Sequence, residues 1–415
     1  MHEKLNYLDF KNAITKSLDL VNSTQLSEMI PLNCAIGRVL SKDVICRKNL
    51  PAFDNSAMDG FAIRFCDAGK TLNIKKSIFA GDKIDDLQEI LEENKCYKIM
   101  TGAKVPSCVD TIIPIENCPF VCENSVQIPE DIKKGANLRL KGEEQKLGDV
   151  ILKKGEVINS SSIALLASQG IMIVEVYKKI TIAILSTGNE LKEPWENSSD
   201  EEIYNCNSYA LISQLKEKNF EATYCGVIPD DLEKSVDFIK NLKNYDVIIS
   251  TGGISMGDAD FVGEAFLKNG LDIAFHGVNI KPGRPIMMGK MKDSLVVCLP
   301  GNPLTAMINV SLFVIPMLKK LQGEISINHG FVKATNKNEF KTKKGRVNIV
   351  LGKVENSIFE VARANKYGSG MITVLYESNA ILVSSEDVSS INENQEIKLI
   401  LLDGHFFEEK ADFLN

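Results

Sequence analysis

The stretch YDVIISTGGISMGDAD, residues 245–260, decides the fold class of this chain of 415 residues. Val247 to Ser250 is a short apolar run rich in β-branched residues, which is typical of a fully buried strand in a parallel sheet. Gly252 and Gly253 follow, and paired glycines allow backbone N–H groups to approach an anion without obstruction by a Cβ atom. Ligands of open α/β sheets bind at the carboxyl ends of the strands, so this stretch predicts a ligand site.

The same loop also carries acids. Ser255, Asp258 and Asp260 add a hydroxyl and two carboxylates directly after the glycines. Carboxylates about 4 Å from each other, or from a phosphate, repel by roughly 4 kcal/mol at an effective dielectric near 20. A phosphate loop beside acids therefore predicts a bridging divalent cation, most simply Mg²⁺ on oxygen ligands. The alternative is an ordinary glycine turn whose acids cap the next helix.

Two neighbouring strand patterns, at 180–185 and 222–228, end in a similar way. Glu190 follows the first pattern and Asp231 follows the second. Because parallel strands bring their carboxyl ends to one edge of a sheet, we expect these two acids to converge with Asp260 and to hold the metal.

The loop KPGRP, residues 281–285, supplies positive charge that could bind an anion. Lys281 and Arg284 lie between prolines that stiffen this loop. Charge-assisted hydrogen bonds from such side chains to phosphate contribute about 1.5–3 kcal/mol each. The alternative is a solvated basic loop without a ligand.

Composition excludes several classes of protein. A net charge of −7 argues against a nucleic-acid binder, and no apolar run reaches the roughly 20 residues of a membrane span. The ten cysteines are scattered singly without a CxxC pair, and only four histidines are present. This pattern argues against a structural zinc site and predicts reduced thiols in the cytoplasm.

The order of the patterns predicts several domains. An amphipathic helix is expected over 8–20, and short strands between turn residues at 71–128 indicate a β-rich module. Helical character returns at 162–168, so the β-rich module could be an insertion into a discontinuous first domain. After residue 179 strands and helices alternate, whereas strands without helices after residue 327 predict a small barrel or sandwich.

Seven motifs give the chain a family resemblance. They are PAFDNSAMDGFAIR (51–64), MTGAKVP (100–106), STGNEL (186–191), YNCNSYAL (204–211), DVIISTGGISMGDADF (246–261), KPGRP (281–285) and LPGNP (299–303). In this order they resemble the MoeA family of molybdopterin molybdenumtransferases, which is related to the E domain of gephyrin. The resemblance spans nearly the whole chain.

The resemblance implies a multi-domain α/β and β fold. An elongated domain I would comprise residues 1–45 and 136–178, with an inserted β-rich domain II at 46–135. A central three-layer α/β molybdopterin-binding domain would follow at 179–326, and a C-terminal β-barrel at 327–415. It also implies a homodimer whose active sites lie between the subunits.

The reaction implied by the resemblance inserts molybdate into adenylylated molybdopterin, with Mg²⁺-dependent release of AMP. A molybdopterin adenylyltransferase would be the pathway partner, and neither nucleic acid nor membrane would be involved. The implied catalytic residues are Asp59, Glu190, Asp231, Asp260 and Lys281. The implied substrate contacts are Thr101, Gly252, Gly253, Ser255, Arg284, Pro300, Pro303, Arg346 and Ser369. The metal would be held by Glu190, Asp231 and Asp260.

The chain departs from the family pattern at four positions. Glu144 stands where an aspartate is frequent, and Asn189 replaces an acid of the common STGDEL form. Gly277 falls where a basic pair is often found, and Arg284 replaces a lysine.

Two other functions fit parts of the sequence: an adenylyltransferase or nucleotide pyrophosphatase on the same α/β fold, or a non-catalytic scaffold like gephyrin. A preference for molybdate over tungstate is not encoded in any of these motifs.

Overall fold

The computed structural model describes residues 7–85, 90–254 and 261–402. The expected site residues Ser255, Asp258 and Asp260 lie outside the described residues. The chain divides into two compact units, which we describe separately. Unit 1 comprises residues 1–41, 155–158 and 174–415, and unit 2 comprises residues 42–154 and 159–173.

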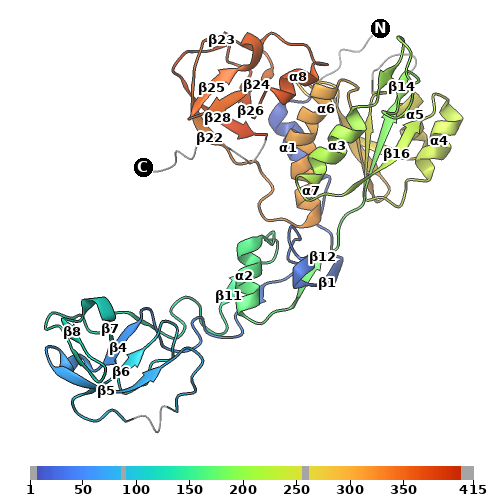
Figure 1. Cartoon of the computed structure of the whole chain (residues 1–415). Coiled ribbons are helices and arrows are strands. Elements are labelled where there is room, and N and C mark those ends of the chain that lie inside the picture. The colour runs from blue at the N-terminus through green and yellow to red at the C-terminus, as the bar shows by residue number, and fades with distance from the viewer. Residues whose placement is uncertain (1–6, 86–89, 255–260, 403–415) are drawn as a thin grey trace. The chain divides into compact units, whose positions relative to one another are not determined.

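The larger part of unit 1 is a sheet of six described strands covered by helices on both faces (Figure 1). In spatial order the strands are β16 (Ala222–Ile228), β13 (Ile182–Thr187), β17 (Val247–Thr251), β21 (Ser294–Leu299), β20 (Met287–Met291) and β18 (Leu271–His276). The first four run parallel, and β20 and β18 are antiparallel to their neighbours. The prediction that residues 247–250 form a buried parallel strand is confirmed, since β17 is fully buried.

Two hydrophobic cores place the helices on opposite faces of this sheet. One core packs against α1 (Phe10–Asp19), α3 (Asn207–Lys216), α6 (Pro303–Asn309), the π-helix η4 (Val310–Val314) and α7 (Ile315–Gln322). The other core packs against α4 (Leu232–Lys240) and α5 (Phe261–Lys268). The three-layer α/β architecture is therefore confirmed. Helix α1, which we expected in the elongated domain I, lies against η4 and α7.

The C-terminal part of unit 1 is a closed barrel, which confirms the β-barrel implied by the family resemblance and excludes the sandwich that the strand pattern had left open. Its strands are β24 (Val347–Glu355), β25 (Ile358–Val361), β22 (Val332–Asn336), β28 (Glu396–Leu401) and β26 (Ala380–Ser384), and β26 closes the barrel onto β24. The short elements beside it are β23 (Phe340–Lys341), η5 (Ala362–Asn365), α8 (Ile372–Tyr376) and β27 (Ser390–Ile391). One further strand, β19 (Ile280–Lys281), joins β24 from the α/β part.

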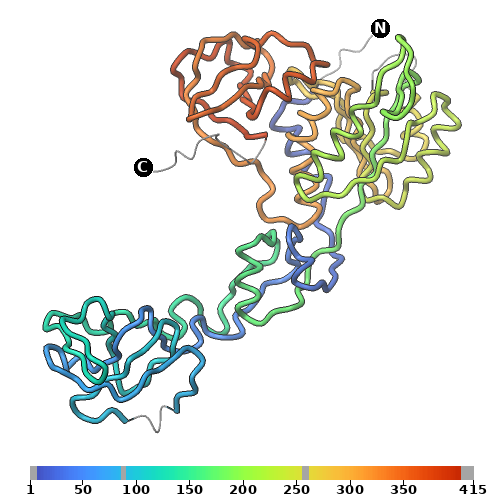
Figure 2. The backbone as a smooth tube through the Cα atoms, viewed as in Figure 1, coloured from blue at the N-terminus to red at the C-terminus, as the bar shows by residue number. Residues whose placement is uncertain are grey.

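Unit 2 contains the β-rich module predicted from sequence. Its sheet has the order β7 (Thr111–Pro114), β4 (Gly60–Ile63), β6 (Lys95–Ile99), β5 (Thr71–Ile78), β9 (Ser125–Gln127) and β8 (Phe120–Val121). The remaining elements are β2 (Val44–Ile45), β3 (Asn55–Ser56), η2 (Phe65–Asp67), η3 (Ile115–Asn117), β10 (Leu138–Arg139), β11 (Val150–Leu152) and α2 (Ser160–Ser168). The backbone trace shows the outgoing and returning parts of this unit running beside each other (Figure 2), as the pairs β2–β11 and β3–β10 require. Unit 1 has a comparable short pair between β1 (Ser27–Pro31) and β12 (Ile173–Tyr177), with η1 (Leu32–Cys34) after β1.

One helix of unit 1 is long and apolar enough to cross a membrane, although no apolar run of this length was expected from the sequence. The continuous helix Pro303–Gln322 has 20 residues, and its most apolar window of 18 residues has a mean hydropathy of 1.5. However, 78% of its most apolar window is buried inside the protein. This helix combines α6, η4 and α7, and its apolar character is explained by its place in the core.

All ten cysteines are free thiols, and burial separates their expected reactivities. Burial raises the pKa of Cys96 to about 12 and that of Cys118 to about 11. Only thiolates react readily, so at pH 8 we expect iodoacetamide to modify the exposed Cys34, Cys66 and Cys122 first. Mass spectrometry of the native protein should show Cys96 and Cys118 unmodified until the protein is unfolded. Early alkylation of Cys96 would contradict this order.

Candidate active site

The expected anion-binding residues come together in one cavity of unit 1. It has a volume of about 520 Å³ and lies where the α/β part meets the barrel. Its lining includes Lys281, Arg284, Pro300, Arg346 and Ser369, which are five of the residues predicted from sequence. We call it the basic cavity, because three cations and no carboxylate are found among the described residues that line it. A cavity of this size and charge is suited to a phosphorylated or oxyanion ligand.

The KPGRP loop is held at the cavity by both parts of unit 1. Strand β19 pairs in parallel with the start of β24, so that Lys281 lies opposite Asn348. The Nδ2 atom of Asn309, a buried residue of α6, donates to the carbonyl of Gly283 at 3.0 Å. A side chain at Gly283 would collide with Asn309, because a Cβ atom would lie 2.8 Å from its Oδ1. The loop is therefore fixed before any ligand arrives.

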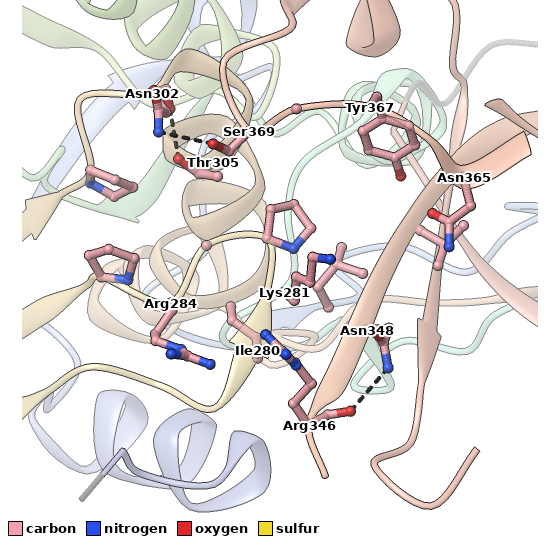
Figure 3. A pocket seen from close by; sticks show the side chains of 17 residues that line it. Ile280, Lys281, Arg284, Asn302, Thr305, Arg346, Asn348, Asn365, Tyr367 and Ser369 are labelled. Atoms are coloured by element: carbon pink, nitrogen blue, oxygen red, sulfur yellow. Dashed lines mark hydrogen bonds between the residues drawn. The ribbon is translucent and has the colours of Figure 1, made fainter. Parts of the chain in front are cut away.

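Figure 3 shows Lys281 between two groups of polar side chains. On one side Asn302 donates to the Ser369 hydroxyl at 3.0 Å, and Thr305 donates to the Asn302 carbonyl at 2.8 Å. On the other side lies Arg346, whose carbonyl accepts from Asn348 at 3.1 Å. Hydroxyl and amide groups on one wall and a guanidinium on the other can contact several oxygens of one ligand.

The departures at Arg284 and Gly277 share a structural explanation. The Arg284 guanidinium lies over the ring of Tyr7, 4.5 Å from its centroid. This arrangement is a cation–π contact, which favours the planar guanidinium over an ammonium group. Gly277 has a φ of +86°, and a Cβ atom there would lie 2.6 Å from the Tyr7 ring. Glycine at position 277 thus makes room for the aromatic ring that supports Arg284.

A smaller cavity of about 90 Å³ lies at the carboxyl ends of the parallel strands. Glu190, Asn207 and Pro303 are among its lining residues, and we call it the strand-end cavity. The Asn207 amide donates to the carbonyl of Gly301 at 2.8 Å, which links α3 to the loop before α6. Glu190 thus lies at this edge of the sheet and lines a cavity there.

The neighbouring acids are arranged differently from the expectation. Asp231 caps helix α4, since its side chain accepts from the Lys234 N–H at 2.9 Å. Asp230 points across the strand ends instead and accepts from the amide of Asn189 at 2.7 Å. The neutral Asn189 amide, which replaces an acid of the family pattern, therefore serves as a donor to a carboxylate.

The paired glycines act mainly through close packing. Both have positive φ, 84° at Gly252 and 62° at Gly253, and a Cβ atom on Gly252 would lie 2.4 Å from the Thr187 hydroxyl. The Gly252 N–H, which we expected to face an anion, donates to the carbonyl of Leu299 at 2.9 Å. These glycines allow β13, β17 and β21 to end close together at the strand-end cavity.

The described residues by themselves do not form a metal site. No group of three or more His, Cys, Asp or Glu side chains suited to a metal ion occurs among them. Glu190 lies at the correct edge, Asp231 is partly used as a helix cap, and Asp260 is outside the described residues. The donor set in hand is therefore a partial fit to Mg²⁺, which usually takes one or two carboxylates and retains several waters.

Unit 2 brings the two other predicted residues together. The Asp59 carboxylate accepts from the Thr101 N–H at 2.7 Å and from its hydroxyl at 2.8 Å. These two hydrogen bonds hold the pKa of Asp59 below its ordinary value, so it is ionised at neutral pH. The loops around residues 54–60 and 100–106 are joined further by bonds from Gly102 to Ser56 and from Val105 to Asp54. Two motifs far apart in sequence thus make one exposed anionic site.

Sequence reasoning missed several polar residues of the basic cavity. Asn302, Thr305, Asn348 and Tyr367 all line it, but none was predicted. Asn302 belongs to the LPGNP motif, where only the prolines were selected. Asn348 is a buried amide in the mostly apolar strand β24. A polar residue within an apolar run could have marked it as a site residue from sequence.

The fold defines a class: a three-layer α/β domain joined to a small β-barrel, with a cavity lined by three cations where the two parts meet. Three family models cover most of the chain: the MoeA N-terminal region (domain I and II) at residues 8–170, a probable molybdopterin binding domain at 183–320, and the MoeA C-terminal region (domain IV) at 333–402. The chain belongs to the MoeA family, and it is accordingly an enzyme of the transferase class.

Individual relatives agree with this assignment. A molybdopterin molybdenumtransferase of Haemophilus influenzae is 31% identical over 401 residues, which are 94% of this chain and 98% of the relative. A protein of the same name from Staphylococcus aureus is 27% identical over 418 residues, 98% of this chain and 99% of the relative. The crystal structure of a molybdopterin biosynthesis MoeA protein from Pyrococcus horikoshii has a TM-score of 0.83 at 29% identity, covering 95% of this chain and all of that one (100%).

Proposed function

We propose that this enzyme inserts molybdate into adenylylated molybdopterin, releasing AMP and molybdenum cofactor. The observation that carries the proposal is the basic cavity, where Lys281, Arg284 and Arg346 converge and no described carboxylate lines the wall. Molybdate is a tetrahedral oxyanion and the pterin substrate carries phosphoryl groups, so both suit a cavity of cations and neutral donors. The names of the relatives support molybdenum transfer to molybdopterin.

The residues that line the basic cavity differ in how they can bind the ligand. Lys281 offers a compact charge that can follow an oxyanion, whereas the fork of Arg346 can bind two oxygens at once. Asn302 and Ser369 offer neutral hydrogen-bonding groups on the opposite wall. Preorganised donors of this kind stabilise charge that develops as a phosphoryl bond breaks.

We propose further that a divalent cation, most simply Mg²⁺, assists the reaction. When bound, such an ion polarises phosphoryl oxygens. Glu190 at the strand-end cavity is the described residue that supports this proposal, with Asp231 and Asp260 as the other proposed ligands. The Asn189–Asp230 hydrogen bond places a further carboxylate beside the same loop.

We also propose a homodimer whose active sites are shared between subunits. The support is that the predicted residues form two separate constellations, Asp59 with Thr101 in unit 2 and the basic cavity in unit 1. A molybdopterin adenylyltransferase is the class of enzyme that must supply the adenylylated substrate.

The free thiols support a reducing, cytoplasmic location.

The central test is an assay of the full chain with adenylylated molybdopterin, molybdate and Mg²⁺. We expect AMP release that depends on molybdate and is abolished by EDTA. Incubation with ATP and unmodified molybdopterin is the comparison, because nucleotide transfer without molybdate would indicate an adenylyltransferase instead. Absence of AMP release with all substrates present would overturn the proposal.

Mixed variants test the shared site. Asp59→Asn and Lys281→Ala chains are each expected to lose most of their activity, because each lacks one constellation in every site. After subunit exchange, a heterodimer would contain one site with both constellations intact, so partial activity should return. Exchange is verified by differently tagged chains, and no recovery in verified heterodimers would contradict the shared-site proposal.

A further inference from the structure

Glu193 lies in the loop that carries Glu190 but has no part in the chemistry described so far. This loop, residues 188–206, contains the short parallel strands β14 (Leu191–Lys192) and β15 (Ile203–Tyr204). The Ile203 N–H donates to the Glu190 carbonyl at 2.9 Å. The backbone of Glu190 is therefore part of the same ladder as the strands on either side of Glu193.

The Glu193 carboxylate receives hydrogen bonds from three neutral groups. The Tyr224 hydroxyl donates to Oε1 at 2.6 Å, and the Asn205 amide donates to the same oxygen at 3.2 Å. The Tyr209 hydroxyl donates to Oε2 at 3.0 Å. Each such bond to a charged acceptor is stronger than one between neutral groups, so the carboxylate is held in one position.

The three donors come from different elements. Tyr224 belongs to β16 at the edge of the sheet, Tyr209 belongs to α3, and Asn205 connects β15 to α3. Burial, followed by the neighbouring Glu193 carboxylate, raises the pKa of Tyr224. Its phenol therefore remains a donor throughout the neutral and moderately alkaline range. Through Glu193 the loop is tied both to the sheet and to a helix.

Asn205 connects the hydrogen bonds around Glu193 to the strand-end cavity. It is 1% exposed, and its Oδ1 accepts from the Ser186 hydroxyl at 3.2 Å and from the Ser208 N–H at 3.3 Å. Two residues further on, Asn207 lines the cavity and donates to Gly301. A change in the position of Asn205 would thus move a wall of that cavity.

We infer that Glu193 is a positioning residue, which fixes Glu190 and Asn207 at the strand-end cavity through hydrogen bonds from Tyr209, Tyr224 and Asn205. It does not contact the cavity itself, since it is not among the lining residues. The catalytic consequence rests on the proposed function, whereas the ordering of the loop does not. The two can therefore be tested separately.

The fluorescence of Trp195 reports directly on the mobility of the loop 188–206. Trp195 is the one tryptophan of the chain, is 74% exposed, and lies edge-on to Tyr209 with ring centroids 6.5 Å apart. In the full-length Glu193→Ala variant we expect lower Trp195 fluorescence anisotropy, because the loop loses the hydrogen bonds of Glu193 with Tyr224 of β16 and Tyr209 of α3. The matched control is Glu201→Ala, which removes an exposed carboxylate of the same loop outside this network.

The second measurement is the kinetics of AMP release. Glu193→Ala should raise KM for adenylylated molybdopterin by about tenfold with a smaller change in kcat, since a lost charged hydrogen-bond cluster loosens binding groups. Glu193→Gln, which keeps one acceptor oxygen for Tyr224, should recover much of both signals. Unchanged anisotropy and KM in Glu193→Ala would overturn the inference. Altered anisotropy in a protein whose wild type releases no AMP would count against the proposed function alone.

Discussion

Replacement of Lys281 by alanine is expected to lower kcat/KM for AMP release by about 10²–10³-fold, as loss of one preorganised donor to a developing oxyanion does elsewhere. Lys281 stands between the Asn302–Ser369 wall and Arg346 in the basic cavity (Figure 3), so neither side group can take its place without moving. The measurement is steady-state AMP release at saturating molybdate and Mg²⁺.

A control substitution at another lysine distinguishes the loss of a cavity contact from the general loss of one positive charge. Lys290 is exposed on β20 and does not line the basic cavity, so Lys290→Ala removes the same charge at a distance. We expect its kcat/KM to remain within about twofold of the wild type, as for surface substitutions generally. Equal activity of Lys281→Ala and the wild type would remove Lys281 from the site.

The largest effect on stability is expected from Gly60→Ala in unit 2. Gly60 lies on β4 between β6 and β7, opposite Ile99 and Pro114. A Cβ atom at this position would lie 2.1 Å from the carbonyl oxygen of Ile113, which is backbone and cannot rotate away. We expect unit 2 to lose about 3 kcal/mol or more of unfolding free energy, at the upper end of the cost of overpacking.

Thermal unfolding and limited proteolysis would measure this loss. Cleavage should begin within residues 42–154 while unit 1 remains protected. Gly330→Ala is the control, because a Cβ atom there meets nothing within 4 Å. A Gly60→Ala protein with the melting profile and protease resistance of the wild type would contradict the close approach of β4 and β7.

Much of the fold could be predicted from local patterns. The run before Gly252 identified the central parallel strand, because a β-branched run without alternating polar residues is typical of a strand covered on both faces. The lack of helices after residue 327 predicted an all-β region; the strand pattern left a barrel and a sandwich open, and only the family resemblance implied the barrel. Closure of β26 onto β24 is a long-range pairing, and no local pattern encodes it.

The candidate site shows the same division. Lys281 and Arg284 were selected from one loop and Arg346 and Ser369 from two later places in the chain, and the structure places all four on one cavity. In contrast, Asp231 and its neighbour Asp230 are indistinguishable in sequence, and only the direction of the chain at the start of α4 decides which carboxylate caps the helix.

The sequence by itself determined the family, the central α/β sheet and the residues proposed to bind an anion, because these depend on periodicity and on motifs read along the chain. The tertiary structure alone decided which polar groups meet: β19 joins the barrel, Asn309 holds Gly283, and three donors surround Glu193. Such contacts join residues far apart in sequence. Their geometry depends on packing of whole elements, which no single stretch of sequence contains.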